Sequence, residues 1–138
     1  MTTRARGLRL PEELQEEIER EMALRGATFS EVASSLLREA VRMRRVPGIV
    51  FMDGPAGRRA SIAGTGLDVW EVISTFKSVD GDRGRLKASY EWLSDRQLSA
   101  AFAYYDLYQR EIDARIEEEG RWTPENLYEE FPFVRPSD

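Results

Sequence analysis

Three arginines near the start of the chain carry the side chains best suited to recognition chemistry. Arg4, Arg6 and Arg9 fall within six residues, and no acidic residue precedes Glu12. A guanidinium group presents its donors in a rigid fork that matches a phosphate or the O6 and N7 edge of guanine. The N-terminal segment therefore indicates contact with a nucleic acid, even though the whole chain carries a net charge of -5.

The chain lacks the side chains that most enzymes use near neutral pH. It contains no cysteine and no histidine, so thiol nucleophiles, thiolate metal sites and imidazole bases are excluded. Asp80 and Asp82 lie in a glycine-containing segment, but two carboxylates without a basic partner are usually solvated. We therefore expect no catalytic residue, no metal site and no cofactor. An enzyme that uses Asp53, Asp80 or Asp82 with a metal is the least favoured interpretation.

The element that must position the arginines is a short strand over Ala5–Leu10. Leu8 and Leu10 recur with the two-residue period of a half-buried strand. A single strand of this length has no stability of its own, so it needs a partner strand. The face opposite the leucines carries Ala5, Gly7 and Arg9.

Two amphipathic helices follow this strand. Pro11 suits the first turn of a helix over about Glu12–Leu24, and Gly26 suits its end. Thr28 and Glu31 have the spacing of a capping box, which predicts the start of a second helix. The apolar stripe of that helix consists of Val32, Leu36, Leu37, Ala40 and Val41.

One copy of this segment has too little apolar material to cover both stripes. A strand without a partner and two uncovered helices predict an obligate dimer, in which the two strands pair antiparallel and the helices interlock. The LRLPEEL opening and the GATFSEV restart resemble the ribbon-helix-helix family of DNA-binding proteins over about Thr3–Arg45. Dimerisation without DNA binding is the alternative.

The resemblance implies a two-stranded ribbon in the major groove of operator DNA, with the outward strand residues reading base edges. Arg9 would bind a guanine and Ala5 a thymine methyl group, whereas Gly7 offers nothing to read. We expect phosphate contacts from backbone amides and hydroxyls at the start of the second helix. The predicted DNA-binding residues are Arg4, Ala5, Arg6, Gly7, Arg9, Thr28 and Ser30.

The middle of the chain is expected to form a small helical domain behind a hairpin. Glycine and proline bracket two short strands over Ile49–Met52 and Ala60–Ala63, and AGTG is expected to be a tight turn. Asp68 then caps a helix, another helix lies around Arg85–Tyr90, and Ser94 caps a last helix that runs toward the acidic EIDARIEEE. We expect Trp70, Trp92, Tyr104 and Tyr105 to be core or interface aromatics.

The stretches RASIAGTGLDVW and WLSDRQLSAAFAYY resemble a domain family of unknown function, number 433, over about Pro47–Arg110. The family occurs in VapB-type antitoxins and is regarded as homeodomain-like. Many members carry an Arg and a Pro where this chain has Gly66 and Asp68. Without that Arg, direct binding of phosphate by this domain is less favoured.

The last segment is acidic and rich in aromatic residues. Residues 111–138 hold three arginines against nine acids, although a simple disordered tail would have few aromatics. Aromatic anchors on such a segment indicate ordering on a partner, or else folding back on the middle domain. The VapB resemblance implies that this partner is a PIN-type ribonuclease toxin. Arg135 would bind the metal-binding acids of the toxin, and Arg121 is the second candidate for this role. The predicted toxin-binding residues are Trp122, Tyr128, Phe131, Phe133, Arg135 and Arg121.

The sequence thus predicts a mainly α fold in three parts. Residues 1–45 form a ribbon-helix-helix domain for DNA binding and dimerisation, residues 46–119 a small helix-turn-helix-like domain with a β-hairpin, and residues 120–138 an extended partner-binding tail. The predicted function is an antitoxin that neutralises a PIN-type toxin and represses its own operon, in the cytoplasm and without a membrane span. The alternative is a stand-alone ribbon-helix-helix transcription regulator whose C-terminal domain senses a signal or another protein.

Overall fold

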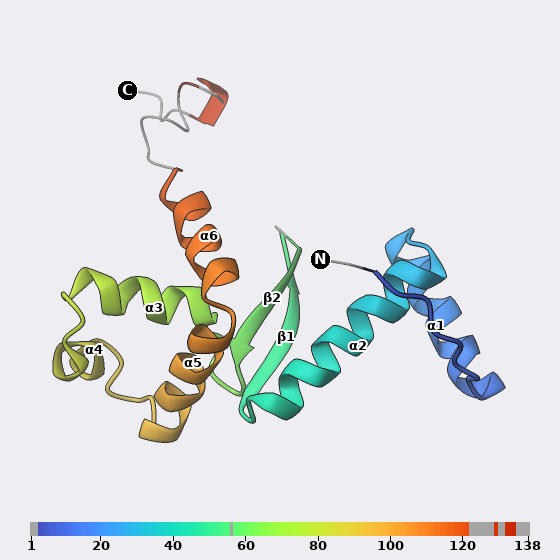
Figure 1. Cartoon of the computed structure of the whole chain (residues 1–138). Helices are drawn as coiled ribbons and strands as arrows, with labels where there is room; N and C mark the ends of the chain where they lie inside the picture. Colours follow the sequence, from blue (N-terminus) through green and yellow to red (C-terminus); the bar gives the residue numbers. More distant parts are fainter. Residues whose placement is uncertain (1–2, 56, 122–128, 130–131, 135–138) are drawn as a thin grey trace. The chain divides into compact units, whose positions relative to one another are not determined.

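The structure, a computed structural model, describes residues 3–55, 57–121, 129 and 132–134 (Figure 1). Within these residues the chain is mainly helical, with six α-helices, one two-stranded antiparallel sheet and a 3-10 turn over Pro132–Val134. The predicted mainly α fold with a small hairpin is thereby confirmed. The packing divides the chain into two units, Met1–Arg42 (unit 1) and Met43–Asp138 (unit 2).

Unit 1 contains α1 (Glu12–Arg25) and most of α2 (Phe29–Arg45). The helix end expected at Gly26 is confirmed, because Gly26 adopts a left-handed conformation with φ 62° and its cap N–H bonds the Met22 carbonyl. The capping box is also confirmed: the Glu31 N–H donates to Thr28 Oγ1 and the Thr28 N–H donates to the Glu31 carboxylate, both at 3.2 Å.

The predicted N-terminal strand is not formed within the single chain. Residues 3–10 have no assigned strand structure and pair with no other strand in the part of the chain that the structure describes. Backbone donors and acceptors of a strand need a partner strand, and the sheet in unit 2 pairs only its own two strands. The ribbon with a second copy stays a prediction.

The described part of unit 1 buries little apolar surface. Ile18 and Val32 are its buried hydrophobic residues, at 5% and 3% exposure. The large apolar side chains that stay between 40% and 82% exposed are Leu8, Leu14, Leu24, Phe29, Leu36, Leu37 and Val41.

Unit 2 begins with a hairpin of β1 (Ile49–Gly54) and β2 (Gly57–Ile62), in which Ile49 lies opposite Ile62 and Gly54 opposite Gly57. Both strands reach further toward the turn than predicted, and β2 ends one residue earlier. Gly57, the first residue of β2, has a φ of 104°, a left-handed backbone conformation that glycine adopts without strain.

Four helices complete unit 2: α3 (Val69–Ser78), α4 (Arg83–Ser89), α5 (Asp95–Leu107) and α6 (Gln109–Gly120). α4 begins two residues earlier than predicted, because the Asp82 carboxylate accepts from the Arg85 N–H at 3.1 Å and caps it. Gly84 therefore lies inside the helix and not in a loop. The expected single last helix is interrupted at Tyr108, whose φ of -126° and ψ of 41° are not helical.

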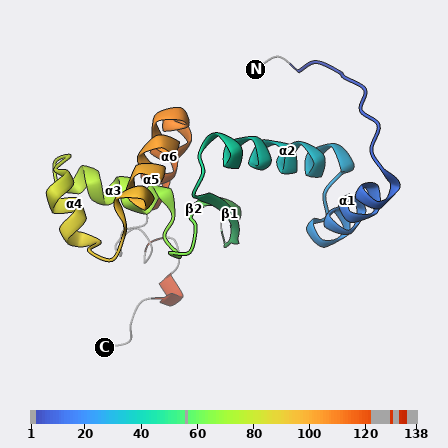
Figure 2. The same ribbon diagram turned by 90° about the horizontal axis from the view of Figure 1, so that it is seen from below.

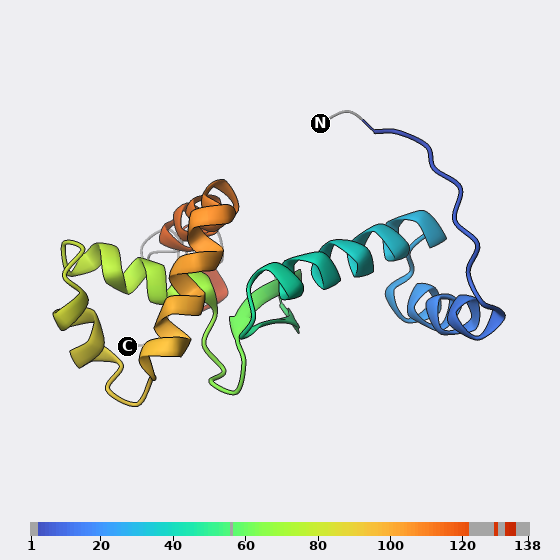
Figure 3. The same ribbon diagram turned by 60° about the horizontal axis from the view of Figure 1, so that its bottom comes forward.

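The core of unit 2 lies between the hairpin and α3, α5 and α6. In all three ribbon views α3 runs from the hairpin to α4, so α4 lies at the far end of the unit (Figures 2 and 3). Val69, Val72, Ile73, Ala101 and Tyr104 are fully buried, and Leu86 of α4 and Leu93 before α5 close the cluster. Over the described residues, the helices are too short or too polar to cross a bilayer.

Candidate nucleic-acid interface and partner groove

The predicted DNA-reading residues lie together on the extended segment of unit 1. Arg4, Ala5, Arg6, Gly7 and Arg9 are all exposed. A Cβ built on Gly7 would meet no atom within 4 Å, so the segment has open space where the family resemblance implies a reading side chain. The single chain thus presents its three guanidinium groups to solvent.

The predicted phosphate contact at the start of α2 has a competitor. Thr28 and Ser30 are exposed there, but the capping box holds the Glu31 carboxylate at the same helix end. A carboxylate occupies the position of favourable helix-dipole interaction that a phosphate would use. The donors of the first helical turn, including the Ser30 hydroxyl, would have to offset the repulsion between the phosphate and the Glu31 carboxylate.

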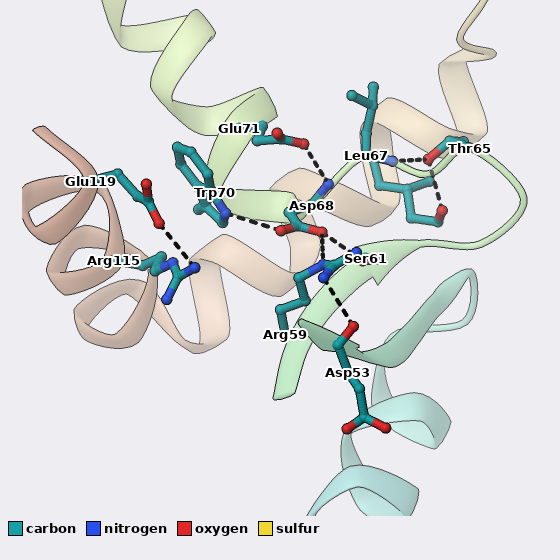
Figure 4. Close-up of polar contacts among 11 residues, drawn as sticks. Asp53, Arg59, Ser61, Thr65, Leu67, Asp68, Trp70, Glu71, Arg115 and Glu119 are labelled. Carbon is teal, nitrogen blue, oxygen red and sulfur yellow. Dashed lines mark hydrogen bonds and ion pairs between the residues drawn. The ribbon is translucent and has the colours of Figure 1, made fainter. Parts of the chain in front are cut away.

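A buried carboxylate organises the junction of the hairpin and α3 in unit 2 (Figure 4). Asp68, the N-cap residue of α3, is 7% exposed. Its side chain accepts from Arg59 Nε at 2.7 Å, Ser61 Oγ at 2.8 Å and Trp70 Nε1 at 3.1 Å, while its own N–H donates to the Glu71 carboxylate at 2.9 Å. The cap predicted at Asp68 is confirmed, and the carboxylate also joins β2 to α3.

The Asp68 network positions one wall of an open groove of about 290 Å³, which we call the α6 groove. Arg59 comes from β2, Trp70 from the first turn of α3 and Arg115 from α6 (Figure 4). The apolar part of the lining consists of Phe51, Ala60, Trp70, Ile112 and Ala114, and the charged part of Arg58, Arg59, Arg115, Glu111 and Glu118.

Arg115 has an unusual position in this groove. Its guanidinium lies 5.9 Å from the centre of the Trp70 ring and pairs with the Glu119 carboxylate at 2.9 Å. Its Nε is buried and has no hydrogen-bond partner among the described residues. A buried donor without an acceptor costs about 1–3 kcal/mol, so the groove contains a donor that is not satisfied in this conformation.

A second charged cluster lies on the other side of α6. Lys77 Nζ donates to Asp113 Oδ1 at 2.7 Å, and the Tyr105 hydroxyl donates to the same oxygen at 2.8 Å. The hydrogen bond from Lys77, and then that from Tyr105, lowers the pKa of Asp113, while the bond to Asp113 raises the pKa of Lys77. Both side chains are about half exposed, so this cluster is a surface contact between α3 and α6.

The carboxylates considered for catalysis serve local structure. Asp82 caps α4, and Asp80 has a positive φ of 55° in the turn before it. Asp53 pairs with Arg58 at 3.3 Å. The described residues contain no group of three or more potential metal ligands.

Most of the predicted toxin-binding residues lie in the part of the chain that the structure does not describe. Trp122, Tyr128, Phe131 and Arg135 lie outside the described residues. Phe133 belongs to the 3-10 turn and is 83% exposed, and Arg121 pairs with Glu117 at 3.8 Å.

Sequence reasoning missed the α6 groove. Arg58, Arg59 and Arg115 were not singled out as a site, because the groove joins β2 to a helix more than fifty residues later in the chain. Arg59 and Asp68, on either side of the turn, were a local signal of opposite charges.

The four aromatic residues expected in a core or interface differ in exposure. Tyr104 is fully buried, Trp70 and Tyr105 are half-buried, and Trp92 is 62% exposed.

Comparisons with known proteins yield one solved structure. It is described as a "duf433 member protein" from Anabaena variabilis, is 26% identical in sequence, covers 78% of this chain and 99% of its own, and superposes with a TM-score of 0.44. Its description names the same family number 433 that the residues of the middle segment resemble. No family model matches the chain, and no curated protein does.

Proposed function

We propose that the chain is the antitoxin of a type II toxin-antitoxin pair and that it represses its own operon by binding operator DNA as a ribbon-helix-helix dimer. The observation that carries the proposal is the composition of unit 1. It combines an extended segment bearing three exposed arginines with two helices whose large apolar side chains stay exposed.

A second copy would complete this unit in one step. Pairing the two N-terminal segments gives each strand the partner that the single chain lacks, and interlocking the helices covers Leu36, Leu37 and Val41. Each large apolar side chain that becomes fully buried contributes about 1.5–3 kcal/mol. The paired ribbon then projects two copies of Arg9, and each bidentate contact to a guanine gives about 1–3 kcal/mol of discrimination.

The toxin part of the proposal draws on the sequence resemblance to VapB-type antitoxins. A PIN-type ribonuclease uses a cluster of metal-binding carboxylates, which an arginine of the acidic tail, Arg135 or Arg121, would engage. In this function the chain performs no catalysis and holds no cofactor. Toxin-bound dimers on neighbouring half-sites would gain effective concentration, which gives autoregulation.

DNA binding is tested with the full chain and its own upstream DNA. Affinity is expected to fall steeply with salt, with a log-log slope of about -0.9 for each phosphate contacted. A chain that ignores this DNA at low ionic strength would contradict the proposal.

Toxin binding is tested by ending the chain after Gly120. The shortened chain should keep its operator affinity but fail to protect a co-expressed toxin, because unit 1 is intact and the tail is absent. Retained protection would place the toxin site elsewhere.

The second candidate function is a stand-alone regulator that senses a signal through unit 2. The α6 groove favours it, since a concave site with aromatic and charged lining is where a ligand would bind. A neighbouring reading frame for a PIN-type nuclease supports the antitoxin, and the absence of such a frame supports the regulator.

A further inference from the structure

We propose that the junction of α5 and α6 is a hinge with two states: the bent state of this structure, and a straight state in which residues 95–120 form one continuous helix and α6 leaves the core. Two hydrogen bonds across the bend, from Tyr104 to Glu111 and from Tyr105 to Asp113, hold the bent state, and we call them the hinge latch. The hinge lies within unit 2 and goes beyond the function proposed above, because it requires neither DNA nor toxin.

The sequence on both sides of the bend favours a continuous helix. Between Ser94 and Gly120 the chain contains neither glycine nor proline, the residues at which helices most often bend sharply. Tyr108 nevertheless has a non-helical φ of -126° and ψ of 41°. Contacts elsewhere in unit 2, and not the local sequence, must therefore produce the bend.

The bend leaves backbone donors without helical partners. The Tyr108 N–H still bonds the Tyr104 carbonyl at 2.9 Å, and the Ile112 N–H bonds the Tyr108 carbonyl at 3.2 Å. Among the described residues, no backbone carbonyl accepts from the N–H groups of Gln109 and Arg110, as is usual at the start of a helix. A continuous helix would pair both groups with the carbonyls four residues earlier. The straight state thus gains backbone hydrogen bonds that the bent state lacks.

The hinge latch gives the bent state contacts that a straight helix loses. The Tyr104 hydroxyl donates to Glu111 Oε2 at 2.7 Å, and the Tyr105 hydroxyl donates to Asp113 Oδ1 at 2.8 Å. Side chains on a straight helix meet when they are three or four residues apart. The latch partners are seven and eight residues apart. That separation is roughly 10–12 Å along a helix axis, so both bonds depend on the bend.

Burial of α6 against the core adds to the latch. Ile112 is 4% exposed and belongs to the same core cluster as Val69 and Val72 of α3. Lys77 of α3 also donates to Asp113 Oδ1, at 2.7 Å, so a latch carboxylate joins α6 to α3. Straightening the hinge would uncover Ile112 and break this contact. The bent state is therefore dominant, and the latch sets how often α6 leaves the core.

The hinge would control access to the core side of α6. Ile112 is buried in the bent state, so a molecule can reach it only when the hinge opens. The apparent Kd of any molecule that binds the straight state alone rises by the inverse of the population of that state. The latch would thus regulate such binding without contacting the bound molecule.

The test uses thiol labelling, because the chain contains no cysteine of its own. In an Ile112→Cys background of the full-length protein, the thiol reacts with iodoacetamide only when α6 opens. The double change Tyr104→Phe and Tyr105→Phe removes both latch hydroxyls and keeps both rings. Because two hydrogen bonds to carboxylates are lost, labelling should become at least about tenfold faster. Unchanged labelling would overturn the latch.

Gln109 provides the variants that distinguish straightening from local unfolding of α6. It is the first residue of α6, where proline is tolerated because its missing N–H needs no acceptor. In the straight state the same residue lies inside a helix, which an interior proline disfavours by roughly a hundredfold. Gln109→Ala is the matched control, since it also removes the hydrogen bond to the Tyr105 hydroxyl but permits both states. Labelling of the Ile112→Cys thiol should be at least about tenfold slower with proline than with alanine.

A thiol at Leu86→Cys reports unfolding of the whole unit, because Leu86 is 1% exposed and lies in α4, outside the hinge. Its labelling should be the same in the proline and alanine variants. Labelling of the Ile112→Cys thiol that is equally fast or faster with proline would overturn the proposal, because α6 would then open without straightening. None of these outcomes depends on DNA or toxin binding, which are tested separately.

Discussion

The two units of the chain solve the problem of apolar burial in opposite ways. Unit 2 surrounds Ile73 and Tyr104 completely with its own hairpin and helices. Unit 1 buries Ile18 and Val32 but leaves Leu36 at 41% and Leu37 at 57% exposure. A segment with that much exposed apolar surface is typical of a binding surface. Unit 2 therefore completes its core within one chain, whereas the exposed apolar side chains of unit 1 are the basis of the dimer that we propose.

This difference also separates two kinds of recognition. Unit 1 presents basic groups on an extended segment, which suits a long anionic partner such as DNA. Unit 2 presents mixed charges around an apolar groove, which suits a peptide.

The largest effect is expected from Leu36→Glu in unit 1. If a second copy covers Leu36, the variant buries two unpaired carboxylates in each dimer, at about 3–5 kcal/mol each, and dimerisation and operator binding are lost. Sedimentation velocity measures the loss. Arg38→Glu places the same carboxylate two residues away on the charged side of α2 and should leave the dimer intact; equal behaviour of the two variants would contradict a covered stripe.

Ile73→Ala tests the self-sufficient unit. Ile73 is fully buried, so its truncation should cost about 2–5 kcal/mol of the free energy of unfolding of unit 2. Because side chains of the same chain bury Ile73, the cost should not depend on protein concentration in urea titrations. A concentration-dependent midpoint would show that unit 2 also relies on a partner.

The Asp68 network is expected to contribute somewhat less to the free energy of unfolding of unit 2. Asp68→Ala removes the cap of α3 and leaves the donors of Arg59, Ser61 and Trp70 unpaired, at about 2–4 kcal/mol. Asp68→Asn keeps one acceptor and the shape, so it should cost about half as much. Thermal unfolding followed by Trp fluorescence compares them, and equal losses would mean that the charge alone matters.

Arg9→Ala distinguishes recognition from folding in unit 1. Arg9 is exposed, so its removal should leave the dimer stable while reducing discrimination between operator and unrelated DNA by about 1–3 kcal/mol per contact. Competition binding measures the ratio. Arg20→Ala removes an arginine from α1 and should preserve discrimination; if it behaves like Arg9→Ala, Arg9 has only a general electrostatic role.

The smallest effect belongs to the Lys77–Asp113 contact. Both side chains are partly exposed, so Asp113→Asn should cost at most about 0.5 kcal/mol at neutral pH. The lowered pKa of Asp113 means that its contribution is complete above the usual carboxyl pKa and is lost as pH falls through the folded-state value. The raised pKa of Lys77 means that the contribution of Lys77 to stability is complete below the usual lysine pKa and is lost as pH rises through the folded-state pKa.

The unmodified protein and the Asp113→Asn variant should therefore differ in stability throughout the range between the ordinary pKa values of 3.8 for Asp and 10.5 for Lys, and converge only below the lowered pKa of Asp113 and above the raised pKa of Lys77. Urea titrations across this range check it. A difference that persists in acid would assign the effect to the Tyr105 hydrogen bond alone.

Local signals in the sequence predicted the local structure well. The Gly26 stop, the Thr28–Glu31 box and the Ser94 cap are confirmed, the last by the Gln97 N–H bonding Ser94 Oγ at 3.1 Å. Each depends on residues within four positions of one another. The start of α4 was misplaced because Asp82, which was interpreted as solvated, is a cap.

Features that depend on distant residues were not predictable in the same way. The α6 groove forms only because β2, the first turn of α3 and α6 lie together in the fold. The sequence separation of Arg59 and Arg115 does not indicate that they line one groove. The interruption at Tyr108 likewise accompanies its ring packing on Tyr104, with centroids 4.7 Å apart, inside a continuous helical pattern. The N-terminal strand stays a prediction, because the partner strand that it would need belongs to a second chain.

The most direct test of the central claim is sedimentation equilibrium of the full-length protein combined with hydrogen exchange of α1 and α2. The account predicts a mass of about twice 15.9 kDa and protection of both helices that declines as the dimer dissociates on dilution, while unit 2 stays protected. A monomer of 15.9 kDa whose α1 and α2 amides are as protected as those of α3 would contradict it.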